Sequence, residues 1–397
     1  MRVGIDAHKR TCVASIFESD MVLEHPPKER LTFKTTRGDV NAFMARVAEN
    51  SVVVVESSTT GKVISRMLTG KCEVHLVAPP ERKPAVKTDR RDSERIVRED
   101  ALGYLRRCYM PSPYVEDMRF IVAQQMRLAE NISRVKSQVH SLLERNMLQS
   151  AFEDISDIFG VEGLGRLSTL ARELPGCEAE ALAMHLEELK LYISQHRQIE
   201  RQVARVAESD EDCQLLLTHP GIAQFTAVAI KARIGEVGRF PSKKHLCSYA
   251  GVVPRSDNTG EYVSEHASVK HGDDVLKYAL TCAVRGAVKA GASTAVKRFY
   301  LKQVRKGKAP QDAEVAAARK LACIIWRVLT SRRSYVDEDR YLTARKRRET
   351  FRKARAIIPE AAKPEQIPKL IEELKSGANI LEQYPERTRV TVWKEDR

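Results

Sequence analysis

Four acidic residues near the start of the chain have the types and spacing that bind divalent metal ions. Asp6 follows the apolar residues 3–5, and Glu56 directly follows four consecutive valines. Asp89 and Asp92 are three residues apart, so on a helix they share one face. Four carboxylates repel each other unless cations lie between them, and Mg²⁺ or Mn²⁺ prefers oxygen ligands. A pair of such ions about 4 Å apart stabilises the attacking and leaving oxygens of phosphoryl transfer, which is the chemistry that this set predicts.

Each acid also has an ordinary structural explanation. Asp6 could be a turn residue at a strand end, and Asp89 or Asp92 could cap a helix or lie on its solvated face. These explanations do not account for the shared order of strand Asp, strand Glu and helical Asp-x-x-Asp. The order therefore favours a metal site.

The charge of the chain points to a polyanionic partner. The 67 Lys and Arg residues exceed the 53 Asp and Glu residues, which gives a net charge of +14 and a pI near 9.4. A soluble basic protein without such a partner is the plain alternative. Lys87, Arg90 and Arg91 flank the paired aspartates and would suit a phosphate backbone. Aromatic residues make up only 6%, so we expect electrostatic binding of DNA and RNA rather than base stacking.

The elements that position the acids can be read from the hydrophobic pattern. β-Branched and apolar runs predict strands at residues 3–6, 11–17, 31–35, 52–55 and 74–77, with helices at 40–47 and 63–68. This succession predicts an α/β domain with a mixed sheet and helices packed on it. A further helix, carrying the paired aspartates, is expected from residue 89 to residue 107, ahead of Pro111 and Pro113.

The middle and end of the chain have a helical pattern. Apolar residues recur at steps of three and four over 117–147 and 178–207, which predicts amphipathic helices that form an arm between domains and mediate self-association as a dimer or tetramer. From residue 211 the pattern is mainly helical. We expect a tight turn at 218–223, in which exposed amides such as that of Gly221 could hold a phosphate. Beyond Tyr335 we expect a basic helix and a weakly packed tail.

These features give a domain plan and a cellular context. The plan has a catalytic domain at 1–112, a helical arm at 113–210, a second domain at 211–335 and a charged tail at 336–397. The eight cysteines show neither a disulfide nor a zinc-site spacing and are expected to be buried free thiols. The chain has no membrane span or signal sequence, so we expect a cytoplasmic, nucleoid-associated protein.

A polar loop at 254–261 offers candidate nucleophiles. Ser256, Thr259 and Tyr262 carry hydroxyls, and Gly260 would let a DNA backbone approach closely. The alternative is an ordinary turn in which polar side chains satisfy backbone groups.

Several motifs in order resemble one family. GIDAHK, VVVESS and KTDRRDSER near the start, HPGIAQFTA from His219, and RFPSKKHLCSYAGVVPRSDNTGEY from Arg239 are similar to the DEDD transposases of the insertion sequence 110 group. The resemblance covers residues 1 to about 335. It implies an RNase H-like (RuvC-like) first domain, joined by long helices to a mainly α-helical second domain.

The resemblance also implies a function and roles for residues. It implies a recombinase that cuts and rejoins donor and target DNA, guided by a structured RNA. The carboxylates Asp6, Glu56, Asp89 and Asp92 would bind Mg²⁺. A hydroxyl would bond transiently to DNA, and here Thr259 stands where the family has Ser, with Ser256 as the alternate. Further nucleic-acid contacts are expected at Gly221, Arg255, Gly260 and Lys270. A RuvC-like nuclease without strand joining, or a binding protein without catalysis, are the alternatives.

Overall fold

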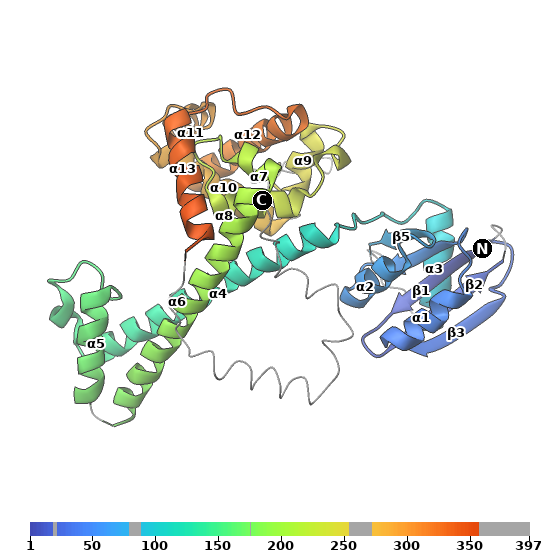
Figure 1. The fold of residues 1–397 in the computed structure, drawn as a ribbon, viewed down its shortest axis with the longest axis horizontal. Coiled ribbons are helices and arrows are strands. Elements are labelled where there is room, and N and C mark those ends of the chain that lie inside the picture. The colour runs from blue at the N-terminus through green and yellow to red at the C-terminus, as the bar shows by residue number, and fades with distance from the viewer. Residues whose placement is uncertain (19–21, 79–88, 175, 254–271, 357–397) are drawn as a thin grey trace, which may run out of the picture. The chain divides into compact units, whose positions relative to one another are not determined.

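The computed structural model describes residues 1–18, 22–78, 89–174, 176–253 and 272–356 (Figure 1). The chain divides into two compact units, the first ending at Ser112 and the second beginning at Pro113. The first unit contains a sheet with helices, and the described part of the second contains only helices and their connections. The predicted mixed α/β domain followed by a helix-rich remainder is confirmed at this level.

The first unit is built on a five-stranded mixed sheet. β1 runs antiparallel to β2, and β2 runs antiparallel to β3, because short connections join them. β1, β4 and β5 are parallel, because a helix connects β4 to β5 and another precedes β4. The order across the sheet is β3-β2-β1-β4-β5. The strands are β1 (Arg2–Ala7), β2 (Thr11–Phe17), β3 (Glu29–Lys34), β4 (Val52–Glu56) and β5 (Glu73–Val77).

Helices cover both faces of this sheet. Ile5 and Val55 share a core cluster with residues of α1 and α2 on one face. Val54 points to the other face, where it packs with Ile96 and Val97 of α3. Successive strand residues therefore alternate between two cores, as the period of two requires. The helices of this unit are α1 (Arg37–Arg46), α2 (Thr59–Leu68) and α3 (Asp89–Ala101).

The prediction that α3 extends to residue 107 is wrong. The helix ends at Ala101, and Gly103 follows in the left-handed region with φ +73°. The amide of Gly103 donates to the carbonyl of Asp100 at 3.0 Å, and that of Tyr104 donates to the carbonyl of Glu99 at 2.9 Å. Glycine is the residue best suited to end a helix in this way. The chain then returns to the sheet edge, where Arg107 forms a bridge with Val77 of β5.

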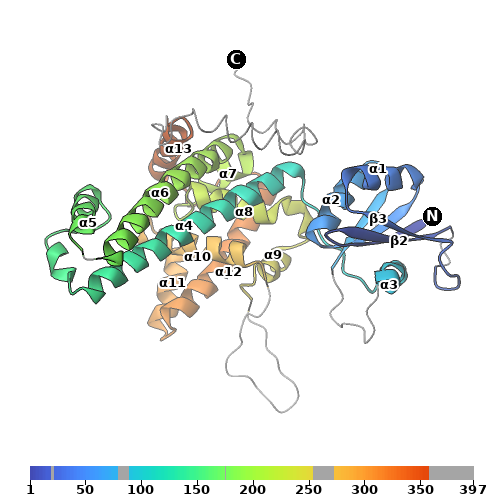
Figure 2. The ribbon, with the colours of Figure 1, turned by 90° about the horizontal axis from the view of Figure 1, so that it is seen from below.

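The second unit is a helical body with a two-helix arm. The first part of α4 and the last part of α6 contribute Met118, Val122, Val203 and Ala207 to the same core as the later helices. The arm continues beyond this core, and its far part packs against α5 (Figure 2). The helices are α4 (Pro113–Arg145), α5 (Val161–Glu173), α6 (Cys177–Ser209), α7 (Glu211–Leu216), α8 (Gln224–Ile234), α9 (Lys243–Tyr249), α10 (Asp274–Lys289), α11 (Ala295–Arg305), α12 (Pro310–Ser331) and α13 (Arg340–Ala354), with short 3₁₀ turns η1 (Gln149–Phe152) and η2 (Val237–Arg239).

The basic helix α13 is packed into this body. It contacts α6, and the ammonium of Lys346 donates to the carbonyl oxygens of His219 at 2.8 Å and Ile222 at 2.9 Å, and to that of Leu217. Burial lowers the pKa of Lys346 to about 8. The amide of Tyr335 also donates to Thr218 Oγ1 at 2.9 Å. The basic helix expected beyond Tyr335 is therefore present as α13 and is an integral helix of the second unit, and the tail expected after it lies outside the described residues from 357 onward.

The cysteines are all free. Cys12, Cys213 and Cys247 are buried, but Cys177 is exposed, so the expectation of uniformly buried thiols is wrong. Across the described residues, no helix combines the length and apolar composition needed to cross a membrane.

Candidate active site

Asp6 and Glu56 are neighbours at the end of two parallel strands. The register pairs Ile5 of β1 with Val55 of β4, so the next residue of each strand stands beside the other. Because Ile5 and Val55 point to the face covered by α1 and α2, Asp6 and Glu56 point to the face covered by α3. The sheet therefore brings both strand-end acids to one edge and one face, as the sequence pattern predicted.

Hydrogen bonds of Ser58 connect the end of β1 to the start of α2, which follows β4. Its hydroxyl donates to the carbonyl oxygen of Ala7 at 3.3 Å and accepts from the amide of Gly61 at 2.8 Å, capping α2. Gly61 is required here, since an added Cβ would lie 2.1 Å from the carbonyl oxygen of Glu56. The helix start after β4 is thus tied to the residue after Asp6.

The direction of α3 brings its first turns toward the same edge. The carbonyl oxygen of Ser93 lies against Gly4, where an added Cβ would approach it to 2.0 Å. About two turns later, Asp100 Oδ2 is 3.7 Å from Arg2 Nη1, at the start of β1. α3 therefore runs antiparallel to β1. The residues that precede Ser93, including Asp92, lie toward the Asp6 end of the strand.

Polar contacts hold α3 in this place along its length. The Ser15 and Ser93 hydroxyls form a buried hydrogen bond of 2.8 Å between β2 and α3. At the other end, His75 Nδ1 of β5 is 2.7 Å from Asp100 Oδ2. Sequence reasoning missed these residues. The available signal was the small size of Gly4 and Ser15 within otherwise apolar strands, which allows a helix to approach closely.

The acids have defined neighbours in this structure. Asp6 is 7% exposed, and its Oδ2 lies 3.1 Å from His8 Nε2. Asp92 is 4% exposed, and its Oδ1 accepts from Arg95 Nη2 at 3.2 Å. Glu56 is partly exposed. Among the residues that the structure describes, no three acidic, histidine or cysteine side chains converge closely enough to hold a metal ion.

The chemistry of the donor set nonetheless matches a hard cation. All four predicted ligands are carboxylates, and Asp6 and Glu56 point to the face on which α3 carries Asp92. Asp89 is the first residue of α3, one turn before Asp92, and its side chain lies outside the described part.

The predicted nucleic-acid contacts are described only in part. Arg91 is exposed on the first turn of α3. Lys87 and the side chain of Arg90 lie outside the described residues, as does the whole candidate nucleophile loop, with Arg255, Ser256, Thr259, Gly260, Tyr262 and Lys270.

The turn around Gly221 differs from the prediction. It is buried, and an added Cβ at Gly221 would lie 2.1 Å from the carbonyl oxygen of Ala283 in α10. The amide of Gly221 donates to His219 Nδ1 at 3.2 Å, so it is already used within the turn. The expected exposed amides are therefore wrong, and the glycine serves close packing between the turn and α10. Burial, and then the charge of Lys346, lowers the pKa of His219 to about 3.

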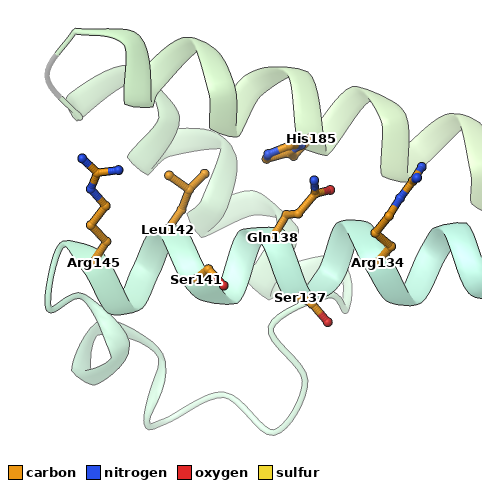
Figure 3. A pocket seen from close by; sticks show the side chains of 7 residues that line it. All are labelled: Arg134, Ser137, Gln138, Ser141, Leu142, Arg145 and His185. Carbon is orange, nitrogen blue, oxygen red and sulfur yellow. The ribbon is translucent and has the colours of Figure 1, made fainter.

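A groove of about 540 Å³ lies between α4 and α6 in the arm (Figure 3). Figure 3 shows Arg134, Gln138 and Arg145 rising from α4 toward α6, which contributes His185. Arg145 is also paired with Glu178 at 3.1 Å. The lining residues include no acid, so the groove is not a carboxylate metal site. They are Arg134, Ser137, Gln138, Ser141, Leu142, Arg145 and His185.

Comparison with known proteins finds transposases similar to this chain and a family match within the second unit. The chain is 26% identical over 270 residues to the transposase for insertion sequence element IS1111A of Coxiella burnetii, covering 66% of this chain and 72% of that protein. It is 27% identical over 243 residues to the transposase for insertion sequence element IS1328 of Yersinia enterocolitica (59% and 70%). It is 32% identical over 129 residues to the pilin gene-inverting protein of Moraxella bovis (32% and 40%). Residues 213–300 match the model of the transposase IS116/IS110/IS902 family, and the chain therefore carries a domain of that family.

Proposed function

We propose that this protein is a DNA recombinase of the transposase type, which cuts DNA strands and rejoins them to new partners. The observation that carries the proposal is the pair of strand-end acids, Asp6 and Glu56, facing α3 in the same chain as a transposase-family domain at 213–300. The names of the relatives, which include transposases and a gene-inverting protein, support strand exchange rather than hydrolysis alone. The β3-β2-β1-β4-β5 order with antiparallel first strands supports an RNase H-like (RuvC-like) first domain.

The first unit would hold the metal. Asp6, Glu56, Asp89 and Asp92 are the proposed ligands of Mg²⁺ or Mn²⁺, which when bound stabilises negative charge on a reacting phosphate. Residues around these acids would have a separate role, which is to hold the four carboxylates on the face of the sheet covered by α3 despite their mutual repulsion. His8 contacts Asp6 and Arg95 donates to Asp92 in the present structure, and the Ser58 and Ser93 contacts hold the elements that carry the acids.

The second unit would supply the nucleophile. In the proposed step the Thr259 hydroxyl loses its proton and attacks a backbone phosphorus. A bond forms between Thr259 Oγ1 and phosphorus as the bond from phosphorus to a deoxyribose oxygen breaks, and that oxygen takes up a proton and leaves as a hydroxyl. The bond energy of the phosphodiester is retained in the covalent protein–DNA bond. A hydroxyl of a second DNA strand can therefore attack the same phosphorus and displace Thr259. The neighbouring Gly260 and the resemblance of the surrounding motif favour Thr259 over Ser256.

RNA guidance completes the proposal. A net charge of +14 with 6% aromatic residues supports binding through phosphates, which RNA and DNA share. The guide would be a structured RNA encoded beside the gene. If purified protein binds that RNA no better than an unrelated RNA of equal length, the guided part of the proposal fails.

A suicide DNA substrate that carries a nick near the cleavage site tests the proposed recombinase function most simply. Such a substrate loses a short fragment after cleavage, so a protein–DNA covalent complex accumulates, and peptide mapping then locates the attachment. We expect attachment at Thr259, with no complex for Thr259→Ala. Attachment at Ser256 or Tyr262 would refute the assignment of the nucleophile. Cleaved DNA without any covalent complex would instead identify a RuvC-like hydrolytic nuclease.

A further inference from the structure

Helix α13 has one face packed against the second unit and another face exposed. Thr343, Thr350 and Ala354 are buried on the packed face, where α13 contacts α6 (Figure 1). The carbonyl oxygen of Ala354 accepts from Arg201 Nε at 3.4 Å and from Arg205 Nε at 3.3 Å, both of α6. The chain itself therefore holds α13 in place, and the exposed face of the helix is formed before any partner binds.

The exposed face carries three arginines, which we call the arginine row. Arg345, Arg348 and Arg352 follow one another at steps of three and four residues, so they lie on the same side of the helix. All three are exposed. Among the described residues, none of the three guanidinium groups forms a hydrogen bond, an ion pair or a ring contact. The arginine row therefore presents three cations whose N–H donors are available to a partner.

Negative charge on α13 does little to balance the arginine row. The helix contains seven Lys and Arg residues and one acid, Glu349, whose carboxylate lies 3.6 Å from Lys353 Nζ. Arg355, which follows the helix, is instead bonded to Glu208 at 2.6 Å. Like charges three and four residues apart destabilise a helix. A bound polyanion would offset this repulsion, so the row is complementary in charge to nucleic acid.

We propose that the arginine row binds backbone phosphates of duplex DNA. The choice of DNA as the polyanion rests on the proposed function. From Arg345 to Arg352 the helix rises about 10 Å, and this length of duplex DNA carries about six phosphates. Each guanidinium can therefore bind a phosphate of its own, and its planar fork matches two oxygens of that phosphate.

The shape of the exposed face favours DNA over duplex RNA. The major groove of B-form DNA is about 12 Å wide and admits a helix, whereas the major groove of A-form RNA is deep and narrow. Because its other face is packed against the second unit, α13 would enter only the mouth of a groove, where the phosphates lie. The arginine row follows residues 213–300, which match the transposase family, so it is a contact outside the family-matched segment.

Salt dependence of binding tests the arginine row without requiring catalysis. The full chain would be titrated with a fluorescent DNA duplex in EDTA over a range of KCl concentrations. The slope of log K against log salt should become shallower by roughly 0.9 for each phosphate contact removed. We expect this loss for Arg345→Gln, Arg348→Gln and Arg352→Gln singly, and about three times this loss for the triple variant. Arg348→Lys retains the charge, so it should keep the slope while the affinity falls.

The matched control is Arg166→Gln on α5, which removes the same charge from a guanidinium that is already bonded to Asp154 at 2.6 Å and to Glu162 at 3.1 Å. Its slope should equal that of the wild-type protein, and thermal unfolding of every variant should show that the fold is retained. An unchanged slope in the single and triple variants, or an equal loss in Arg166→Gln, would overturn the proposal. A shallower slope for duplex RNA with an unchanged slope for DNA would make RNA the partner and would also overturn it. Because EDTA prevents metal-dependent chemistry, these outcomes do not depend on whether the protein cleaves or joins DNA.

Discussion

Replacing Gly4 with alanine should displace α3 and disturb the acids that it carries. The added Cβ would lie 2.0 Å from the carbonyl oxygen of Ser93 and 2.5 Å from Val97 Cγ2. Ordinary contact begins at 3.4 Å, so the helix or strand would have to move by about 1.4 Å (3.4 − 2.0). A backbone oxygen cannot rotate away. We expect Gly4→Ala to cost about 1 to 3 kcal/mol of stability. Asp92 would move with α3, and a displacement of about 1 Å in a reacting geometry can lower a rate roughly 100-fold.

Thermal unfolding and the initial rate of DNA strand cleavage at fixed Mg²⁺ would measure both effects. Gly38→Ala is the control, because nothing lies within 4 Å of its added Cβ in α1. That variant should keep the wild-type rate and gain up to about 1 kcal/mol from its higher helix propensity. A Gly4→Ala protein with unchanged melting temperature and rate would refute the close packing of α3. A lower melting temperature with an unchanged rate would refute the positioning role.

Further predictions concern buried groups and the acids. The folded pKa of His219 is about 3, below its unfolded value of 6.5, so the folded state binds fewer protons between these values and stability should fall as pH drops through this window. His219→Asn should flatten that fall in urea unfolding. Lys346→Met should lower the free energy of unfolding by about 1 to 3 kcal/mol, because it leaves the buried carbonyls of the 217–222 turn without their donor. The control Lys353→Met loses ion pairs of 3.6 and 3.7 Å, and in the same urea unfolding assay it should lower this free energy by less than about 1 kcal/mol. Asp6→Asn and Glu56→Gln should each abolish DNA cleavage while the circular dichroism spectrum stays unchanged. EDTA should also abolish cleavage by the wild-type protein, and full activity in the chelator would exclude the metal mechanism.

Local sequence patterns were sufficient for the strands that carry the acids. The predicted strand 11–17 coincides with β2, and the predicted strand 52–55 lacks only Glu56 of β4. β-Branched residues and alternation act over a few residues, so they can be recognised without knowledge of the rest of the fold. The parallel register of β1 and β4 then brought Asp6 and Glu56 together as expected.

Features that depend on distant partners could not be predicted in this way. The Ser15–Ser93 hydrogen bond joins residues 78 positions apart, and no local pattern signals it. The segment around Gly221 has the composition of an exposed turn, but Gly221 is buried because α10 packs against it. Thr259 lies outside the described residues, so its role as nucleophile remains a prediction from sequence.

Strand joining is the most direct measure of the central claim. Donor and target DNA duplexes would be incubated with the purified protein, Mg²⁺ and the RNA transcribed from the DNA beside its gene, and the products would be sequenced across the junction. We predict joined recombinants with the wild-type protein and none with Asp6→Asn or without the RNA. Cut but unjoined DNA, or recombinants formed equally well by Asp6→Asn, would contradict the proposal of a carboxylate-dependent recombinase.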